Sequence, residues 1–179
     1  MKEYTAKLIY GEKMILGEGP FWDVERQTLS WVDIITGTVY LKRADEVAPV
    51  QTGQYVGAAV PAGGGEYLLA LTTGFYLMDE KGLKQKLASP ENMPLRYRFN
   101  DAKCDKKGRL WAGTIGLYGD ENRQGALYCM EGGRARTMMS GLSLPNGMDW
   151  DDEKRLFYFI DTPGGKVTAY HYDMEKAGI

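Results

Sequence analysis

The sequence predicts an all-β protein with the architecture of a β-propeller. Apolar or aromatic runs that end in Asp or Thr occur four times, and the residues that end them are Asp33, Thr72, Thr114 and Asp161. The intervals between these residues are 39, 42 and 47 positions. A repeat near 40 residues with several short strands per unit is typical of a propeller blade. We therefore expect residues 1–179 to form a single partial propeller domain of about four blades.

The predicted blades share an internal order of strands. In the third unit, residues 110–114 predict one strand, and the Tyr-bearing segment 125–128, which begins at a Gly, predicts the next. The fourth unit has no room for a full outer strand after Tyr172. Residues 4–10 predict an extra strand before the first unit, and no partner for this strand is found in the sequence. An open arc of blades leaves unpaired strand edges, so the sequence also predicts self-association through these edges.

A polar residue type recurs at one position of the repeat, 14 or 15 residues before the residue that ends the second strand. The four equivalent residues are Glu18, Gly57, Asn100 and Asn146. The first strand of a propeller blade lines the central channel, so the three polar side chains are expected to converge there. Strand propensity does not explain them, because Asn is depleted in strands. The alternative is that they only begin strands or cap turns. Gly57 offers no ligand, and its small size predicts free space in the channel.

Five segments resemble the gluconolactonase/regucalcin (senescence marker protein) family, and together they cover essentially the whole chain. The segments are residues 17–23 (GEGPFWD), 31–34 (WVDI), 98–103 (RFNDAK), 108–114 (GRLWAGT) and 146–150 (NGMDW). The resemblance implies a six-bladed propeller that binds a divalent metal ion in its channel and hydrolyses sugar lactones. It also implies that this chain corresponds to about the first three-fifths of that fold.

The resemblance implies that Glu18 and Asn146 are metal ligands. Carboxylate and amide oxygens suit Ca²⁺, Mg²⁺ or Mn²⁺ and are acceptable to Zn²⁺. Taken alone, a Glu between two glycines is more often a surface residue. The third family ligand, an Asp about 50 residues after Asn146, falls beyond Ile179. That Asp is also the favoured general base, so no catalytic residue is assigned within this chain.

The resemblance also implies substrate contacts at Arg98 and Asn100. The guanidinium of Arg98 could donate hydrogen bonds to sugar hydroxyls or to a lactone carbonyl. Asp101 belongs to the same motif and is included as a substrate-binding candidate, although strand alternation points it away from the channel. A further family contact, a Glu, falls on Tyr118, and Glu121 lies three residues later. Neither is assigned a role.

The composition narrows the possible partners and location. The net charge of -2 does not favour nucleic acid, and no apolar run approaches the ~20 residues that span a bilayer. The start of the chain is no secretory signal, and two cysteines do not make a disulfide framework. We therefore predict a cytoplasmic protein. Lys103 and Asp105 are interpreted as ordinary surface residues.

Nucleophilic catalysis is not indicated, because the single histidine, His171, has no Ser-His-Asp or Cys-His context in the sequence. Hydrolysis would then need a metal. Two alternatives stay open: a calcium-binding or protein-interaction propeller without turnover, and an esterase of the paraoxonase or strictosidine-synthase type. The motif at residues 98–103 argues against the esterase. Alone, residues 1–179 are expected to be an inefficient lactonase.

Overall fold

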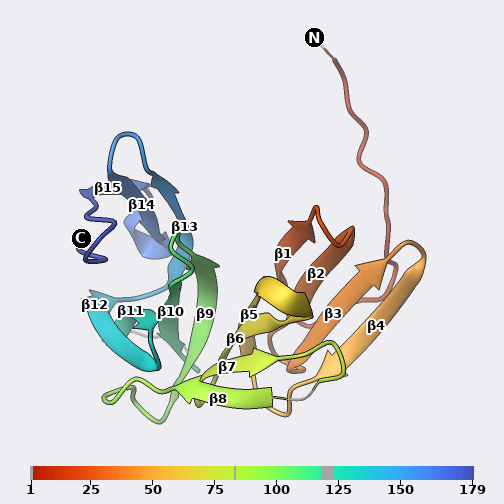
Figure 1. Cartoon of the computed structure of the whole chain (residues 1–179), viewed down its shortest axis with the longest axis horizontal. Coiled ribbons are helices and arrows are strands. Elements are labelled where there is room, and N and C mark those ends of the chain that lie inside the picture. Colours follow the sequence, from red (N-terminus) through yellow and green to blue (C-terminus); the bar gives the residue numbers. More distant parts are fainter. Residues whose placement is uncertain (1, 83, 118–122) are drawn as a thin grey trace.

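The computed structural model describes residues 2–82, 84–117 and 123–179. Four antiparallel sheets stand side by side in an arc, each with its strands in chain order (Figure 1). We call them blades 1 to 4.

Blade 1 holds β1 (Gly17–Asp23), β2 (Thr28–Asp33), β3 (Thr38–Arg43) and β4 (Glu46–Gln51). Blade 2 holds β5 (Val56–Pro61), β6 (Tyr67–Leu71), β7 (Gly74–Met78) and β8 (Lys84–Ala88). Blade 3 holds β9 (Tyr97–Cys104), β10 (Leu110–Gly116), β11 (Gly125–Glu131) and β12 (Arg134–Leu142). Blade 4 holds β13 (Pro145–Asp151), β14 (Leu156–Asp161) and β15 (Thr168–His171).

The predicted all-β propeller of about four blades is therefore confirmed. The helical elements of the described residues are two 3-10 turns, η1 (Gly63–Gly65) and η2 (Thr162–Gly164), both too short to cross a membrane.

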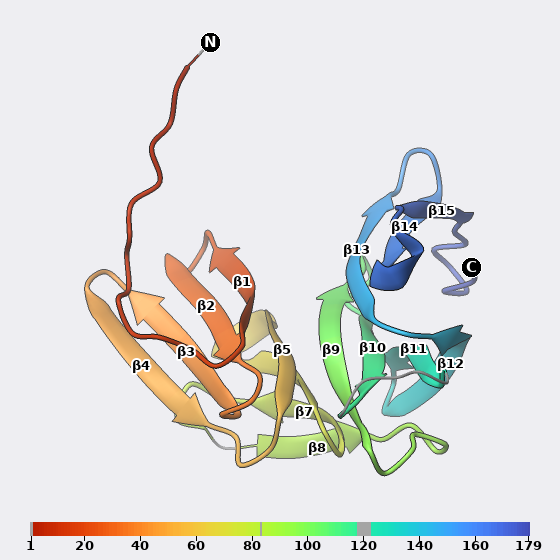
Figure 2. The same ribbon diagram turned by 180° about the vertical axis from the view of Figure 1, so that it is seen from behind.

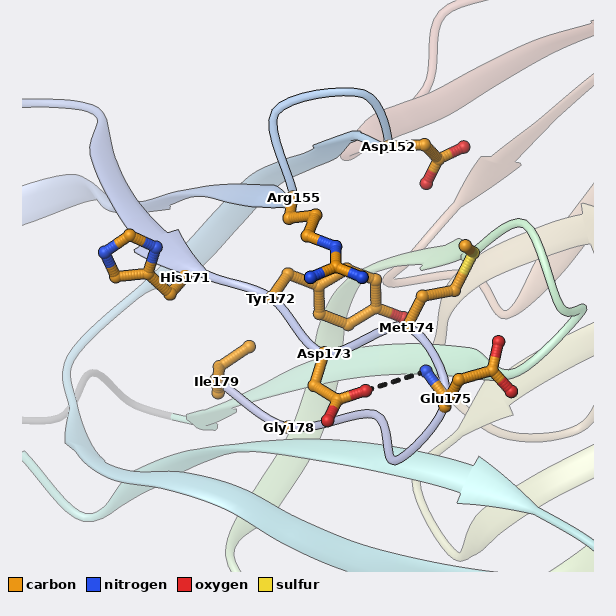
Figure 3. Close-up of a pocket in the computed structure, with 9 residues that line it drawn as sticks. All are labelled: Asp152, Arg155, His171, Tyr172, Asp173, Met174, Glu175, Gly178 and Ile179. Carbon is orange, nitrogen blue, oxygen red and sulfur yellow. Dashed lines mark hydrogen bonds between the residues drawn. The ribbon is translucent and has the colours of Figure 1, made fainter.

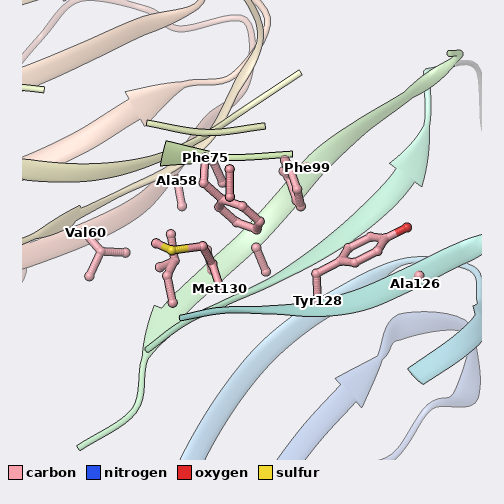
Figure 4. Packing of buried hydrophobic residues seen from close by; sticks show 12 residues of the cluster. Ala58, Val60, Phe75, Phe99, Ala126, Tyr128 and Met130 are labelled. Carbon is pink, nitrogen blue, oxygen red and sulfur yellow. The ribbon is translucent and has the colours of Figure 1, made fainter. Parts of the chain in front are cut away.

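The hydrophobic core lies between the blades, in three clusters that each join two neighbouring sheets. The cluster between blades 2 and 3 includes Phe75 and Phe99, whose rings are 4.7 Å apart, and Tyr128 (Figure 4). Alternation along the strands supplies both sides of a blade: on β10, Leu110 and Ala112 face blade 2 while Trp111 faces blade 4. The middle blades are thus buried on both faces, which explains their nearly continuous apolar runs.

Each innermost strand contains an irregularity at the same place. The register between the first and second strands shifts by one residue between Glu18 and Phe21 in β1, and between Val56 and Ala58 in β5. The same shift occurs at residues 99–102 of β9 and 146–148 of β13. An extra residue in one strand of a pair bends it and re-aims nearby side chains. The polar positions found by the repeat therefore lie at, or directly beside, four equivalent β-bulges.

The structure corrects the interpretation of Gly57 as free space. A Cβ atom added there would lie 2.6 Å from the carbonyl carbon and oxygen of Phe99 and 2.8 Å from the carbonyl oxygen of Asn100. Because Gly57 has no side chain, the backbone of β9 can pack directly against β5. Gly113 serves the next boundary in the same way, since an added Cβ would lie 2.1 Å from Cβ of Pro145.

The predicted strand at residues 4–10 is wrong. This segment pairs with no strand of the described residues and runs outward from blade 1, as Figures 1 and 2 show. Tyr4 and Leu8 are 87% and 86% exposed. Only the end of the segment is held, where the Tyr10 ring packs 5.4 Å from Trp31 and 5.9 Å from Tyr40. An extended segment becomes a strand only when a partner supplies hydrogen bonds.

The interpretation of Asp105 as a surface residue is also wrong. Asp105 and Arg109 form a buried ion pair, with Arg109 Nε 2.6 Å from Asp105 Oδ2. The same oxygen accepts hydrogen bonds from Trp111 Nε1 (3.1 Å) and the Tyr172 hydroxyl (2.8 Å). Arg109 Nη2 donates to the Tyr172 hydroxyl and to the carbonyl oxygen of Met174. This cluster joins the turn of blade 3 to the end of blade 4.

Candidate functional site

The start of each innermost strand is placed by the chain before it. In blade 1, the Asp33 carboxylate accepts hydrogen bonds from the backbone N–H groups of Ile15 (3.0 Å) and Leu16 (3.1 Å), immediately before β1. Asp161 does the same in blade 4, with Ser143 (3.1 Å) and Leu144 (2.7 Å). Two of the four residues that end the second strands thus hold the backbone leading to Glu18 and Asn146.

The pKa of Asp33 reflects this use. Burial by itself would raise it, but the N–H groups of Ile15, Leu16 and Thr36 outweigh burial and lower it. Asp33 is a structural carboxylate, and its oxygens are already occupied by backbone donors.

A continuous hydrogen-bonded run joins three predicted site residues across the boundary of blades 3 and 4. Arg98 Nη1 donates to the carbonyl oxygen of its neighbour Phe99 (2.9 Å) and to Asn100 Oδ1 (3.0 Å). Asn100 Nδ2 donates to the carbonyl oxygen of Pro145 (2.9 Å) and to Asn146 Oδ1 (3.1 Å). The structure therefore brings Arg98, Asn100 and Asn146 together.

Glu18 and Asp101 add two carboxylates near this run. Glu18 is exposed at the start of β1, and its charge acts on groups of blade 3. Burial raises the pKa of Asp101, the Ala102 N–H (2.8 Å) lowers it in part, and the charge of Glu18 raises it again. The alternation argument for Asp101 does not hold through the bulge, because Asn100 and Asp101 together face Gly113.

Arg98 is a buried cation with part of its hydrogen-bonding capacity unused. It is 9% exposed, and burial lowers the pKa of its guanidinium, while the charges of Tyr55 and Glu18 raise it. Within the described residues, no partner is found for its Nε and Nη2 groups. These donors can serve a bound molecule at the channel end of the blades.

The donor chemistry of the group fits a hard divalent cation. Glu18, Asp101 and Asn146 offer only oxygen atoms, and the mutual repulsion of the two carboxylates would be relieved by a cation. Among the residues that the structure covers, no three side chains of His, Cys, Asp or Glu gather closely enough to hold a metal ion. An ion here would therefore use an amide oxygen as well as carboxylates.

Two neighbours of the site were missed from the sequence. Thr162 Oγ1 accepts a hydrogen bond from Asn146 Nδ2 (2.8 Å). Tyr55 is the second: its phenol group raises the pKa of the Arg98 guanidinium. The repeat contained a signal for Tyr55, because it precedes Gly57 by two residues, as Arg98 precedes Asn100. Tyr118 and Glu121, to which no role was assigned, lie outside the described residues.

In the part of the chain that the structure describes, neither His171 nor the two cysteines form a nucleophilic centre. His171 lines a hollow of about 480 Å³ on blade 4 together with Asp173, whose carboxylate is used by the backbone N–H of Glu175 (Figure 3). Burial raises the pKa of Cys104 to about 12 and that of Cys129 to about 11, so both thiols stay protonated.

Known proteins are similar to this chain in sequence and in fold. A putative sugar lactone lactonase, YvrE, of Bacillus subtilis is 36% identical over 172 residues, which cover 93% of this chain and 58% of the relative. A 6-deoxy-6-sulfogluconolactonase of Pseudomonas putida is 31% identical over 177 residues, and the alignment covers 97% of this chain and 60% of the relative. The solved structure of a calcium-binding protein, regucalcin, from Agrobacterium tumefaciens superposes with a TM-score of 0.90 at 22% identity, over 98% of this chain and 60% of the other.

The chain thus spans about three-fifths of the length of the relatives that it matches. The model of one family, described as the SMP-30/gluconolactonase/LRE-like region, matches residues 16–179. Because this match covers nearly all of the four blades, the chain belongs to the SMP-30/gluconolactonase/LRE-like family.

Proposed function

We propose that this chain forms the greater part of the active site of a sugar-lactone hydrolase. The observation that carries the proposal is the hydrogen-bonded run from Arg98 through Asn100 to Asn146, which lies within reach of the charge of Glu18. Relatives that are named lactonases support the same reaction class.

Arg98 and Asn100 have different roles in binding the substrate. The Nε and Nη2 groups of Arg98 are directed to the lactone, where a buried guanidinium makes strong charge-assisted hydrogen bonds to carbonyl or hydroxyl oxygens. Both Nδ2 hydrogens of Asn100 are used by blade 4, so its amide mainly positions Arg98 and Asn146. Its Oδ1 keeps one further lone pair for a substrate hydroxyl.

Glu18 and Asn146 are the proposed ligands of a divalent cation, with Asp101 as the nearest additional carboxylate of this group. When bound, such an ion would polarise the lactone carbonyl and lower the pKa of a water molecule. Asn146 Oδ1 accepts one hydrogen bond from Asn100 and retains a second lone pair. Asp33 is not available as a ligand or base, because backbone N–H groups occupy both of its oxygens.

The test compares two substrates in one assay. Hydrolysis of glucono-1,5-lactone and of phenyl acetate is followed with Ca²⁺, Zn²⁺, Mn²⁺ or Mg²⁺ and with a chelator, and spontaneous hydrolysis is subtracted. We expect metal-dependent turnover of the lactone by a longer protein that contains this chain, and little turnover by residues 1–179 alone. Preference for phenyl acetate would favour a paraoxonase-like esterase instead.

A second candidate is a calcium-binding module without turnover. One observation favours this alternative. Among the carboxylates that the structure describes, those without structural hydrogen bonds are not placed to act as a general base. Calcium binding by calorimetry without hydrolysis of either substrate would establish this alternative.

A further inference from the structure

A hollow of about 540 Å³ lies between blades 1 and 2. Its walls are the turn after β2 (Ile35, Thr36), the link that leads into β5 (residues 53–55) and the turn after β6 (Thr72, Thr73). Its volume is in the range of small-molecule sites, about 300–1,000 Å³. None of the roles assigned above uses it.

The hollow opens at the same end of the blades as the candidate site. Gly17 pairs with Asp33, and the Ile34 N–H donates to the carbonyl oxygen of Leu16 (3.0 Å), so the turn after Asp33 lies at the end of the blade where β1 begins, just before Glu18. Thr72 donates a backbone hydrogen bond to the Tyr55 carbonyl oxygen (3.2 Å), which places the other two walls at the start of β5. That start packs on the backbone of Asn100 through Gly57.

Tyr55 connects the hollow to Arg98. It lines the hollow, and it lies two residues before Gly57, which packs against the backbone of Phe99, the residue next to Arg98. No partner of the Tyr55 hydroxyl is found among residues 2–82, 84–117 and 123–179. In the repeat, Tyr55 holds in blade 2 the position that Arg98 holds in blade 3.

The lining is neutral and combines apolar surface with hydroxyl groups. Tyr55 is 36% exposed and Ile35 38% exposed, so a ring face and an aliphatic side chain are open to a ligand. Thr73 is held by Gln54 Oε1 (2.8 Å) and the Tyr76 hydroxyl (2.7 Å). A fixed aromatic surface with neutral donors and acceptors suits the C–H face and hydroxyls of a sugar ring.

We propose that this hollow is a subsite for a neutral sugar ring that is joined by a glycosidic bond to the ring received by Arg98. The lactone character of that second ring rests on the proposed function, whereas the binding of a sugar in the hollow does not. The protein would accordingly take lactones that carry an additional sugar unit, and Tyr55 would determine this preference.

The test is a titration of the ¹⁵N-labelled chain with cellobiose, and with glucose for comparison. We expect cellobiose to shift the backbone amide signals of residues 35–36, 53–55 and 72–73, and to bind more tightly than glucose. Tyr55→Ala should weaken cellobiose binding by about tenfold, because the ring supplies most of the contact area. Tyr55→Phe keeps the ring and should lose only a few-fold. Tyr4→Ala, at an exposed tyrosine outside the hollow, is the matched control.

The proposal is overturned if cellobiose shifts no amide of the hollow, or if Tyr55→Ala binds it as well as the unchanged chain while its spectrum stays folded. Glucono-1,5-lactone hydrolysis, measured on a longer protein that contains this chain, separates the two proposals. Turnover without shifts in the hollow leaves the lactonase and removes the subsite. Shifts in the hollow without turnover leave the subsite and remove the lactonase.

Discussion

At the scale of single residues, the candidate site depends on how much of each polar group the protein itself already uses. The carboxylate oxygens of Asp33 accept hydrogen bonds from the backbone, whereas Arg98 uses only Nη1 for hydrogen bonds within the described structure. Asn100 lies between these cases, because its Nδ2 is committed to blade 4 and its Oδ1 is not saturated. Residues with unused capacity are the ones expected to contact a ligand.

Loss of Arg98 or Asn100 should reduce lactone turnover. Arg98→Ala removes the unused donors, and Asn100→Ala releases both Arg98 and Asn146 from their alignment. Each change should cost about 1–3 kcal/mol of transition-state binding, or roughly five- to 150-fold in kcat/KM. Steady-state kinetics with Arg96→Ala, an exposed arginine, as control measures this. Unchanged kcat/KM in either variant would remove the role of that residue.

Glu18→Ala and Asn146→Ala should each weaken binding of a divalent ion in any protein that contains this chain. Glu18 supplies negative charge and Asn146 a neutral oxygen, so the loss should be larger for Glu18→Ala. Calorimetric titration with Ca²⁺ and Mn²⁺ measures the affinity, and Glu46→Ala, an exposed glutamate on β4, is the control. Equal affinities for both variants and the control would contradict the metal assignment.

At the scale of elements, blades 3 and 4 are joined by the Asp105–Arg109 pair, whose side chains are 1% and 3% exposed. Asp105→Ala would leave the Arg109 guanidinium buried without its carboxylate. Removing one partner of a buried pair typically destabilises by about 3–5 kcal/mol. We expect a loss of this order in urea unfolding. Asp151→Ala, which removes the solvent-exposed pair with Lys154, should change stability far less than Asp105→Ala does.

The same pair implies a pH dependence. Burial alone would raise the pKa of Asp105, but hydrogen bonds from Tyr172, Trp111 and Arg109 lower it below its ordinary value. A lowered folded-state pKa stabilises the fold above the unfolded pKa of about 4, and this contribution is lost as the pH falls below it. Unfolding free energies measured from pH 7 to pH 3 should therefore fall less steeply in Asp105→Asn than in the unchanged chain. Identical slopes would show that the folded-state pKa of Asp105 is not lowered relative to its unfolded value.

The close approach of β5 and β9 makes a second prediction at this scale. Gly57→Ala would force a methyl group against the Phe99 carbonyl and should destabilise by about 1–3 kcal/mol, as overpacked sites do. Gly63→Ala is the control, because its added Cβ meets nothing within 4 Å. Thermal unfolding of both variants compares them. Equal stability of the two variants would mean that β9 can move away from β5 at little cost.

At the scale of the whole molecule, the two end blades differ from the middle ones. β5 and β11 are almost wholly buried, while β1 is mostly exposed and includes Phe21 at 41% and Trp22 at 50%. Neighbouring exposed aromatic residues commonly mark an interaction surface. The outer face of blade 1 is therefore the face most suited to association.

We expect residues 1–179, studied alone, to self-associate in a concentration-dependent manner and to hydrolyse lactones inefficiently. The exposed face of blade 1 favours association, and a site open on one side does not exclude water or hold its ligands rigidly. Light scattering after size exclusion should show larger species that diminish in Trp22→Ser but not in Leu95→Ser, at an isolated exposed leucine. A stable monomer with metal-dependent lactone turnover would contradict this expectation.

The sequence alone determined the number and order of the blades, and it predicted the repeat position that Glu18, Asn100 and Asn146 share, while Arg98 was added by the family resemblance of residues 98–103. These follow from local information, because strand alternation and a repeat near 40 residues are written along the chain. Only the tertiary structure decided how the polar groups are used. The burial of Asp105 and the packing of Gly57 against β9 depend on residues from other strands or blades. Residues 4–10 form no strand for a related reason: a strand exists only where another strand completes its hydrogen bonds.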